Sequence, residues 1–364
     1  MNPRILPHGR LMALTLFTLA FVTMLASGSR AQGASGTITS IAGTEGCSNL
    51  TSDPAGNLFF EDDHGVQKLD PASGKITTVA GRDLVISGGG LAIDGAGDLF
   101  IAQGMYGPLA NTVQKIAAGT RQATLYAGTG EPNKGLGNRM PGPATKAITD
   151  NPNRLALDAE GNLYISRTAT GAVWKVTAAT GIISGVPVNY SPAKGAPYIQ
   201  PPGDIKGMTI DSAGNLYLAD VFRPSVWKIP LATLKAERIA GTGADGFSGD
   251  GGPADKAQFS APNGLAVDSG GNLYIADTGN DRIRKVAPDG TITTVAGNGT
   301  ERNVYAHVTL ADGNSVDRYQ KAPDGDGGPA IHARVSSPDS VALDHAGNLY
   351  ICQGILREVR QPPQ

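Results

Sequence analysis

The sequence predicts an all-β protein built from six copies of one small antiparallel unit, and three observations lead to this prediction. Gly and Pro contribute 50 and 24 of the 364 residues, and in the interior of a helix they cost about 1 and 3 kcal/mol each. Hydrophobic residues make up 40% of the chain and charged residues 17%, which favours a folded core over intrinsic disorder. The pattern Asp-x-x-Gly-(Asn/Asp)-Leu-aromatic recurs at 53–59, 94–100, 158–164, 211–217, 268–274 and 344–350.

Residues 1–31 predict a cleavable export signal. Arg4 and Arg10 give a basic start, residues 11–25 are apolar and uncharged, and Ser29-Arg30-Ala31 places small residues at both positions read at cleavage. The alternative is a membrane anchor, which needs about 18 or more apolar residues. The run at 11–25 has fifteen and is too short for that. We therefore expect cleavage after Ala31, a secreted or periplasmic protein, and no membrane span in the mature chain.

Each repeat predicts four strands. Residues 264–267 and 273–276 read as a hairpin around the turn 268–272, where Asp accepts backbone hydrogen bonds and Gly adopts a positive φ. A third strand follows at 66–69, 113–116, 173–176, 226–229, 283–286 and 356–359. A fourth strand is clearest at 76–81 and 292–297. Repeated four-stranded antiparallel units are the blades of a β-propeller.

The two ends of the chain predict how the ring closes. The sixth unit stops after its third strand, whereas residues 37–43 form a strand that precedes the first unit. If this N-terminal strand completes the last blade, it covers a sheet edge that would otherwise be open to aggregation. We expect one six-bladed propeller over roughly 36–360, within a single domain at 32–364.

Part of the chain resembles a complete NHL repeat. The segments PNGLAVD at 262–268, GNLYIAD at 271–277, RIRKV at 282–286 and TVAG at 294–297, with Asn280, carry this resemblance. The loop GDGGPA at 249–254, repeated at 325–330, is similar to loops of exported bacterial NHL proteins. The resemblance covers essentially the whole mature chain. It implies the propeller fold, but NHL propellers include binding scaffolds, sensor ectodomains, RNA binders and a few lyases, so it leaves the function open.

The starts of the six first strands are expected to surround one mouth of the central channel. The residues there are polar and of mixed charge, and the ligand-binding candidates are Asn49, Arg154, Lys206, Asn263 and Asp339. Such a set suits a neutral or zwitterionic ligand, and channel water is the alternative.

Three insertions, 103–112, 185–203 and 298–337, are expected on the same face of the propeller, where loops on a rigid scaffold often bind ligands. The Pro-rich second insertion adds Tyr190 and Tyr198 as candidates, and the third contains His307 and Tyr319. The alternative is that these loops vary passively.

Function is predicted from what the sequence contains and lacks. No two histidines have an i, i+4 metal spacing and no Gly-x-Ser-x-Gly motif occurs, so no catalytic residue is assigned and no cofactor is expected. A net charge of −2 argues against nucleic acid. We expect a monomeric module that binds a protein, peptide or glycan. The alternative is an extracytoplasmic lyase or lactone hydrolase with a divalent metal in the channel, for which Asn49, Asn263 and Asp339 are the local donors.

Cys47 and Cys352 are expected to form a disulfide. They align with the start of the first strand of blade one and the end of the second strand of blade six, which are neighbours in a closed ring. Exported proteins retain disulfides. The alternative is a pair of buried thiols.

Other conspicuous residues receive structural interpretations. The NHL resemblance implies that Asp277 and Arg282 brace a hairpin rather than act as acid and base. The acidic Gly-rich loops at 245–250 and 324–326 resemble calcium loops but lack a bidentate Glu, so no metal site is predicted. Trp174 and Trp227 occupy one third-strand position in neighbouring blades, where packing is favoured over a sugar-stacking role.

Overall fold

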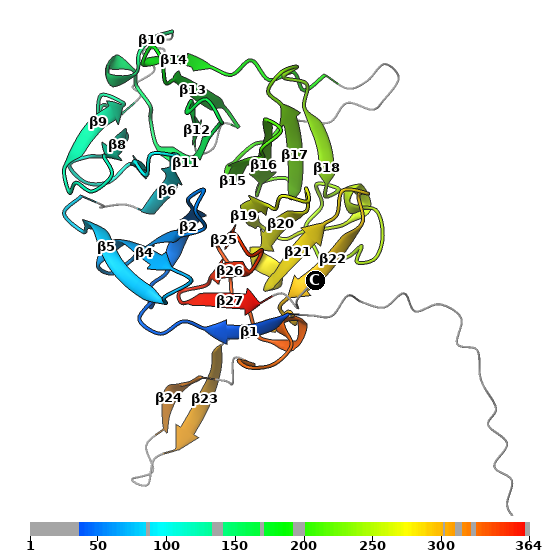
Figure 1. The fold of residues 1–364 in the computed structure, drawn as a ribbon. Coiled ribbons are helices and arrows are strands. Elements are labelled where there is room, and N and C mark those ends of the chain that lie inside the picture. The colour runs from blue at the N-terminus through cyan, green and yellow to red at the C-terminus, as the bar shows by residue number, and fades with distance from the viewer. Residues whose placement is uncertain are drawn as a thin grey trace, which may run out of the picture. The chain divides into compact units, whose positions relative to one another are not determined.

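The computed structural model shows six antiparallel sheets arranged as blades around a central axis (Figure 1). It describes residues 36–84, 88–132, 141–167, 171–191, 201–300, 303–309, 315–321 and 325–360. The predicted signal peptide, its cleavage site and Tyr198 lie outside these residues. The predicted fold class, an all-β six-bladed propeller, is confirmed.

The first strand of each blade lies nearest the axis, where it contacts the first strands of both neighbouring blades. From the axis outward the strands of blades one to three are β2 (Ser48–Ser52), β3 (Leu58–Asp62), β4 (Gly65–Asp70) and β5 (Lys75–Gly81); β6 (Gly88–Ile93), β7 (Leu99–Gln103), β8 (Thr112–Ile116) and β9 (Ala123–Ala127); β11 (Pro152–Leu157), β12 (Leu163–Arg167), β13 (Val173–Thr177), β14 (Ile182–Gly185) and the short β10 (Gly142–Pro143).

Blades four to six follow the same order. Their strands are β15 (Ile205–Ile210), β16 (Asn215–Asp220), β17 (Ser225–Pro230) and β18 (Glu237–Ala240); β19 (Pro262–Val267), β20 (Leu273–Asp277), β21 (Arg282–Val286) and β22 (Ile292–Ala296); β25 (Ser340–Leu343), β26 (Leu349–Cys352), β27 (Leu356–Arg360) and β1 (Thr37–Ser40). The third insertion contains a separate hairpin, β23 (Asn303–Thr309) and β24 (Ser315–Lys321). The described residues also contain four short 3-10 helices: η1 (Ala144–Lys146), η2 (Ala254–Lys256), η3 (Thr278–Asn280) and η4 (Ala330–His332).

The repeated Asp explains why the hairpin pattern is so constant. In blade five, Oδ1 of Asp268 accepts a hydrogen bond from the backbone N–H of Asn272, and Oδ2 accepts one from the Asn272 side chain, both at 2.8 Å. The Tyr274 hydroxyl donates to the same Oδ2 at 3.3 Å. One carboxylate therefore joins the turn to the aromatic residue of the second strand, and blades three, four and six repeat the arrangement.

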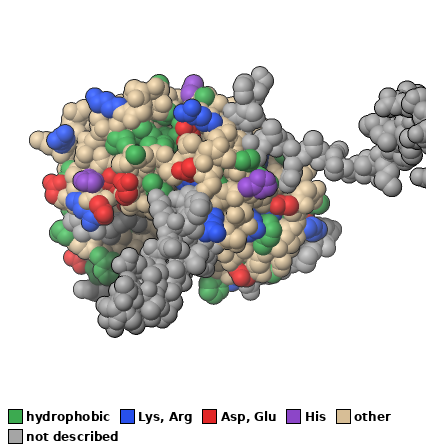
Figure 2. Space-filling view, turned by 90° about the horizontal axis from the view of Figure 1, so that it is seen from below, with side chains coloured by type: hydrophobic (Ala, Val, Ile, Leu, Met, Phe, Trp, Pro, Cys, Tyr) green, Lys and Arg blue, Asp and Glu red, His purple; other side chains and the backbone are tan. Residues whose placement is uncertain are grey.

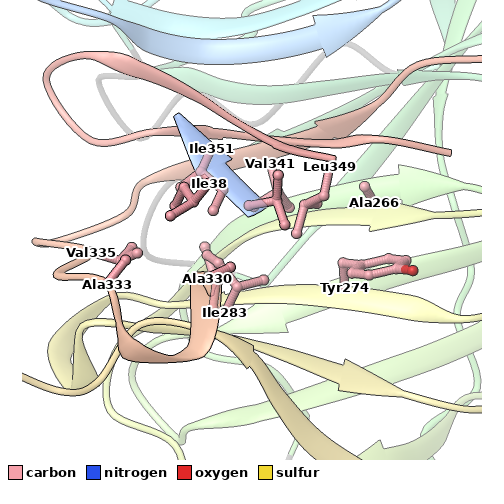
Figure 3. Packing of buried hydrophobic residues seen from close by; sticks show 13 residues of the cluster. Ile38, Ala266, Tyr274, Ile283, Ala330, Ala333, Val335, Val341, Leu349 and Ile351 are labelled. Carbon is pink, nitrogen blue, oxygen red and sulfur yellow. The ribbon is translucent and has the colours of Figure 1, made fainter. Parts of the chain in front are cut away.

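The N-terminal strand completes blade six, as predicted. β1 pairs antiparallel with β27, from Thr37 opposite Arg360 to Ser40 opposite Arg357. Ile38 on β1 is fully buried in a cluster with residues of blades five and six, including Val341 and Ile351 (Figure 3). The closing strand is therefore held by side-chain packing as well as by backbone hydrogen bonds.

A disulfide joins blade one to blade six. Cys47 and Cys352 are bonded, with their Cα atoms 5.5 Å apart. Both residues are buried in one hydrophobic cluster with Leu50 and Tyr350. The predicted pairing is confirmed.

Charged side chains of both signs are mixed on the face of the propeller that Figure 2 shows. On the face that Figure 2 shows, acidic and basic side chains of the described residues lie interspersed among uncharged ones. No helix in the part of the chain that the structure describes is long and apolar enough to cross a membrane.

Candidate functional site

A central cavity of about 520 Å³ runs along the axis of the propeller. Its walls are the first strands of all six blades. At one end it is lined by Asn49, Gly90, Arg154, Gly207, Gly264 and Ser340, and at the other by residues of the Asp turns, namely Asp268, Ser269, Asp344, His345 and Gly347.

Arg154 spans the first of these two ends. Its Nε donates to the carbonyl oxygen of Lys206 at 2.5 Å, its Nη1 to Oδ1 of Asn49 at 2.5 Å, and its Nη2 to Oδ1 of Asn263 at 3.0 Å. One side chain of blade three therefore bonds to blades one, four and five. The structure brings the predicted Asn49, Arg154 and Asn263 together, and the side-chain oxygens of both Asn residues accept hydrogen bonds from Arg154.

Irregular backbone at the starts of the first strands positions these side chains. In five blades the pairing of the first and second strands shifts at this level, as between Pro152 and Leu155 in blade three. Such bulges re-aim side chains next to a site. Asn49 also adopts a left-handed backbone conformation with φ of 50°, which Asn tolerates better than most residues.

Close approach of the backbones narrows this end of the cavity. A Cβ atom placed on Gly207 would lie 1.9 Å from the carbonyl oxygen of Asn263, and one on Gly264 would lie 2.4 Å from Cα of Ser340. Any side chain at these two positions would collide with the next blade. The glycines thus draw the blades together, and the guanidinium of Arg154 fills the remaining centre.

Two carboxyl groups lie near Arg154. The side chain of Glu61 accepts a hydrogen bond from Nδ2 of Asn49 at 3.0 Å through Oε2, while its buried Oε1 has no hydrogen-bond partner. Burial raises the pKa of Glu61 to about 7, although the hydrogen bond from Asn49 and the charge of Arg154 act in the opposite direction. Burial also raises the pKa of Asp339, whose Oδ1 accepts a hydrogen bond from Ser340 Oγ at 2.7 Å.

Sequence reasoning missed Glu61. At the equivalent position, two residues after the aromatic residue of the repeat, the other blades carry only small side chains: Ala102, Ser166, Ala219, Ala276 and Cys352. This departure from the repeat, a carboxylate where the other blades have a small side chain, could have identified Glu61 as a candidate site residue.

The remaining ligand-binding candidates lie apart from the cavity or use other groups. Lys206 contributes its backbone carbonyl to Arg154, and its ammonium lies 3.8 Å from Oδ2 of Asp204. Tyr190 packs edge-to-face on Trp227 with ring centroids 5.4 Å apart and does not line the cavity. The Pro-rich insertion there contacts the hydrophobic cluster that contains Trp227. Whether Asn49, Arg154, Asn263 and Asp339 contact a ligand stays a prediction.

The prediction that Asp277 and Arg282 brace the hairpin as a pair is wrong about the partners. Asp277 pairs with Arg284, whose Nη1 lies 3.3 Å from Oδ2, and accepts two hydrogen bonds from Asn280. Arg282 instead donates to the carbonyl oxygens of Asn280 and Asn298. Arg282 and Arg284 share one face of β21, and the buried one takes the carboxylate because burial leaves its charge no water to compensate it.

The carboxylates of the acidic Gly-rich loops also pair with buried arginines of the third strands. Asp250 accepts hydrogen bonds from Nε and Nη2 of Arg284, and Asp326 pairs with the equivalent Arg357 of blade six. Both arginine side chains are fully buried. Among the described residues no group of three or more His, Cys, Asp or Glu side chains is placed to hold a metal ion.

Large apolar side chains are exposed on one face of the propeller. Met105, Tyr106 and Phe222 lie on loops between second and third strands, and Phe247 lies on the loop that leads into blade five. Such loops emerge at the end where the first strands begin, because neighbouring strands are antiparallel. Phe222 is 73% and Tyr106 72% exposed. We call these four residues the apolar loop patch.

Comparisons with known proteins agree with the fold. The family model of the Teneurin NHL domain matches residues 235–307. Human Teneurin-1 is 33% identical over 119 residues, which cover 29% of this chain and 4% of Teneurin-1. The chain spans less than a tenth of the length of the curated relatives it matches.

Two solved structures share the architecture over most of the chain. An auxiliary nutrient binding protein from Bacteroides ovatus superposes with a TM-score of 0.63 at 12% identity, over 91% of this chain and 78% of that one. Virginiamycin B lyase from Staphylococcus aureus superposes with a TM-score of 0.50 at 11% identity, over 89% and 98%. At such identities the likeness concerns the fold alone. The six repeats, the six blades and the matching family model together show that the chain is an NHL-repeat β-propeller.

Proposed function

We propose that this protein is a monomeric binding module outside the cytoplasm, which holds a protein, peptide or glycan on the face that carries the apolar loop patch. The observation that supports this most is the exposure of Met105, Tyr106, Phe222 and Phe247 on loops of one face. They lie on loops of blade two, of blade four and before blade five, and loops carried by a rigid scaffold commonly hold binding residues.

The chemistry of the patch suits recognition. The guanidinium carbon of Arg223 lies 5.6 Å from the ring centroid of Phe222, and that of Arg282 lies 3.9 Å from the ring centroid of Phe247. Aromatic residues and arginine are enriched in the buried centres of interfaces and in binding hot spots. The rings of Phe222 and Phe247 are already held by a cation, so little freedom of these two side chains is lost when a partner covers them.

The location outside the cytoplasm has two supports. The Cys47–Cys352 disulfide is of a type that persists in oxidising compartments. The export signal predicted at residues 1–31 would deliver the chain there.

The metal-dependent lyase or lactone hydrolase receives less support from the channel. Its donors would be Asn49, Asn263 and Asp339, but the oxygen atoms of both Asn side chains accept hydrogen bonds from Arg154. A divalent ion at this point would have to displace the guanidinium from its partners. We therefore propose a module that needs no cofactor.

The binding surface is tested with the double variant Tyr106→Ser/Phe222→Ser. Peptides from a random display library and glycans from an array are first selected on the wild-type protein, and their Kd values are then measured with both proteins. We expect at least a tenfold weaker Kd for the double variant, because two exposed rings no longer transfer from water to the partner.

The matched control is Leu125→Ser, which removes an exposed apolar side chain from β9 in blade two, away from the loops. It should change the Kd less than twofold. Selection of no ligand, or equal losses in the control and the double variant, would refute the proposal.

A further inference from the structure

We propose that the central channel is a second, separate binding site: a blind pocket that is closed by Arg154, is entered from the face of the Asp turns, and takes a small uncharged ligand rich in oxygen. This face is opposite the apolar loop patch, so the pocket does not depend on any partner of the loops.

One end of the channel is closed by three interblade hydrogen bonds and by backbone contact. Arg154 bonds to Lys206, Asn49 and Asn263 across the axis. Around it the blades touch at Gly207 and Gly264, where no Cβ would fit. Ser340 Oγ also accepts a hydrogen bond from the backbone N–H of Leu50 at 3.0 Å, which joins blades six and one. These contacts narrow this end, and we infer that the guanidinium blocks it while it stays in place.

The other end of the channel reaches solvent. Ser269 and His345 belong to the Asp turns of blades five and six, both line the cavity, and both are exposed. From this rim the cavity extends along the first strands to the guanidinium. Its volume of about 520 Å³ lies within the range of roughly 300–1,000 Å³ typical of small-molecule sites.

The closed end offers hydrogen-bond donors. A guanidinium has five N–H groups, and three of those of Arg154 have acceptors among the described residues. The other two have none there, and Arg154 lines the cavity. A hydroxyl or carbonyl oxygen of a ligand would accept such charge-assisted hydrogen bonds, which are stronger than neutral ones.

The charge around the pocket selects against ions. The single positive charge of Arg154 faces the carboxyl groups of Glu61 and Asp339, both near enough to act on it electrostatically. The carboxyl groups of Asp268 and Asp344 line the cavity at its rim, so an anionic ligand would meet carboxylates at the entrance, and a cationic one would meet the guanidinium at the closed end. The described lining residues include the hydroxyl side chains of Thr51, Ser52 and Thr209 but no Phe, Tyr or Trp, which favours a polyol or small saccharide over a flat apolar molecule.

Entry is tested by thiol modification. The two cysteines are joined in a disulfide, so Thr51→Cys introduces one free thiol within the cavity lining. A small methanethiosulfonate reagent should modify Cys at position 51. Adding Ser269→Trp at the rim should slow the modification at least tenfold. The equivalent turn residue of blade four, Ser212, is exposed and does not line the cavity, so Ser212→Trp should slow it less than twofold.

The closed end is tested in the same background. Adding Arg154→Ala to the Thr51→Cys/Ser269→Trp protein should restore rapid modification, since the channel then opens at its other end. If this variant does not fold, the comparison of Ser269→Trp with Ser212→Trp decides the entrance alone. An unreactive thiol at 51, or equal rates with both Trp variants, would overturn the blind pocket.

Ligand class is tested by saturation-transfer NMR with glucose, glucuronate and glucosamine as neutral, anionic and cationic probes of similar shape. We expect transfer to glucose that Ser269→Trp reduces at least tenfold and Ser212→Trp leaves unchanged. Stronger transfer to either charged probe, or transfer to glucose that is insensitive to Ser269→Trp, would overturn the assignment.

Discussion

Two arginines each make several hydrogen bonds inside this propeller, yet their surroundings differ. Arg284 in blade five donates all five N–H groups, to Asp250, Asp277 and the carbonyl oxygens of Ser248 and Gln258. Arg154 on the axis donates three and lines a cavity. Nearby Glu61 has a buried oxygen without a partner.

The difference separates two uses of a buried charge. A buried polar group is costly unless it is hydrogen-bonded, so saturation of every donor indicates a structural role. Unused donors beside a cavity and an unpartnered buried oxygen are instead typical of a site arranged for something that is not part of the chain. On this basis Arg284 holds a loop to a blade, whereas Arg154 holds blades together and keeps two donors for a ligand.

The largest expected effect concerns the saturated arginine. Arg284→Met should reduce the free energy of unfolding by about 3–5 kcal/mol, because it leaves the carboxylate of Asp277 buried without its cation. Urea denaturation measures the change. Arg282→Met is the matched control on the same strand face, where the side chain is partly exposed and bonds only to carbonyls; it should cost under about 1 kcal/mol. Equal losses would contradict the distinction between the two networks.

The next largest effect concerns Glu61, which belongs to the hydrogen-bond network around Arg154. The pKa of Glu61 is about 7 in the folded protein against an ordinary 4.5, so the folded state binds this proton more tightly. Wild-type stability should therefore fall as pH rises from about 4.5 to 7, by at most about 3 kcal/mol. Glu61→Gln cannot ionise and should lack this fall. Unfolding is measured from pH 4.5 to 8, with the exposed Glu160→Gln as control, and parallel profiles for all three proteins would disprove the assignment.

The smallest expected effect on stability concerns the contact between Arg284 and the loop carboxylate of Asp250. Asp250→Asn removes the charge that receives two of its donors, but the Asp250 side chain is 38% exposed and water compensates in part. We expect a loss of about 1–2 kcal/mol. Asp255→Asn in the following 3-10 helix removes an exposed carboxylate paired with Lys256 and should cost under about 0.5 kcal/mol. A loss for Asp250→Asn no larger than this would show that the loop carboxylate contributes nothing to Arg284.

The fold was predictable because its instructions are local and repeated. The Asp of each repeat bonds to the residue four positions later, so sequence spacing contains the whole interaction. The closing strand and the Cys47–Cys352 pair followed from counting strands around a ring. These inferences need the order of elements and no side-chain geometry.

The site was less predictable because it depends on distances between segments far apart in the chain. Asp277 lies opposite Arg282 in the hairpin register, and only the return of the 250 loop over β21 decides that Arg284 becomes the partner. Asn49, Arg154 and Asn263 were correctly grouped by strand position, but their mutual hydrogen bonds depend on bulges and on glycine contacts between blades. The contact of Tyr190, in the Pro-rich insertion, with Trp227 has no local signal in the sequence.

The disulfide also changes the topology of the chain. Because it joins residues 305 positions apart, residues 47–352 form a covalent circle, and of the blade strands only β27 and β1 lie outside it. A protease that cuts one loop between residues 47 and 352 leaves all the strands covalently connected, because the disulfide still joins the two pieces. Outside the cytoplasm, where loops meet proteases, this propeller would lose a fragment of the circle only after a second cut or after reduction of its single bridge.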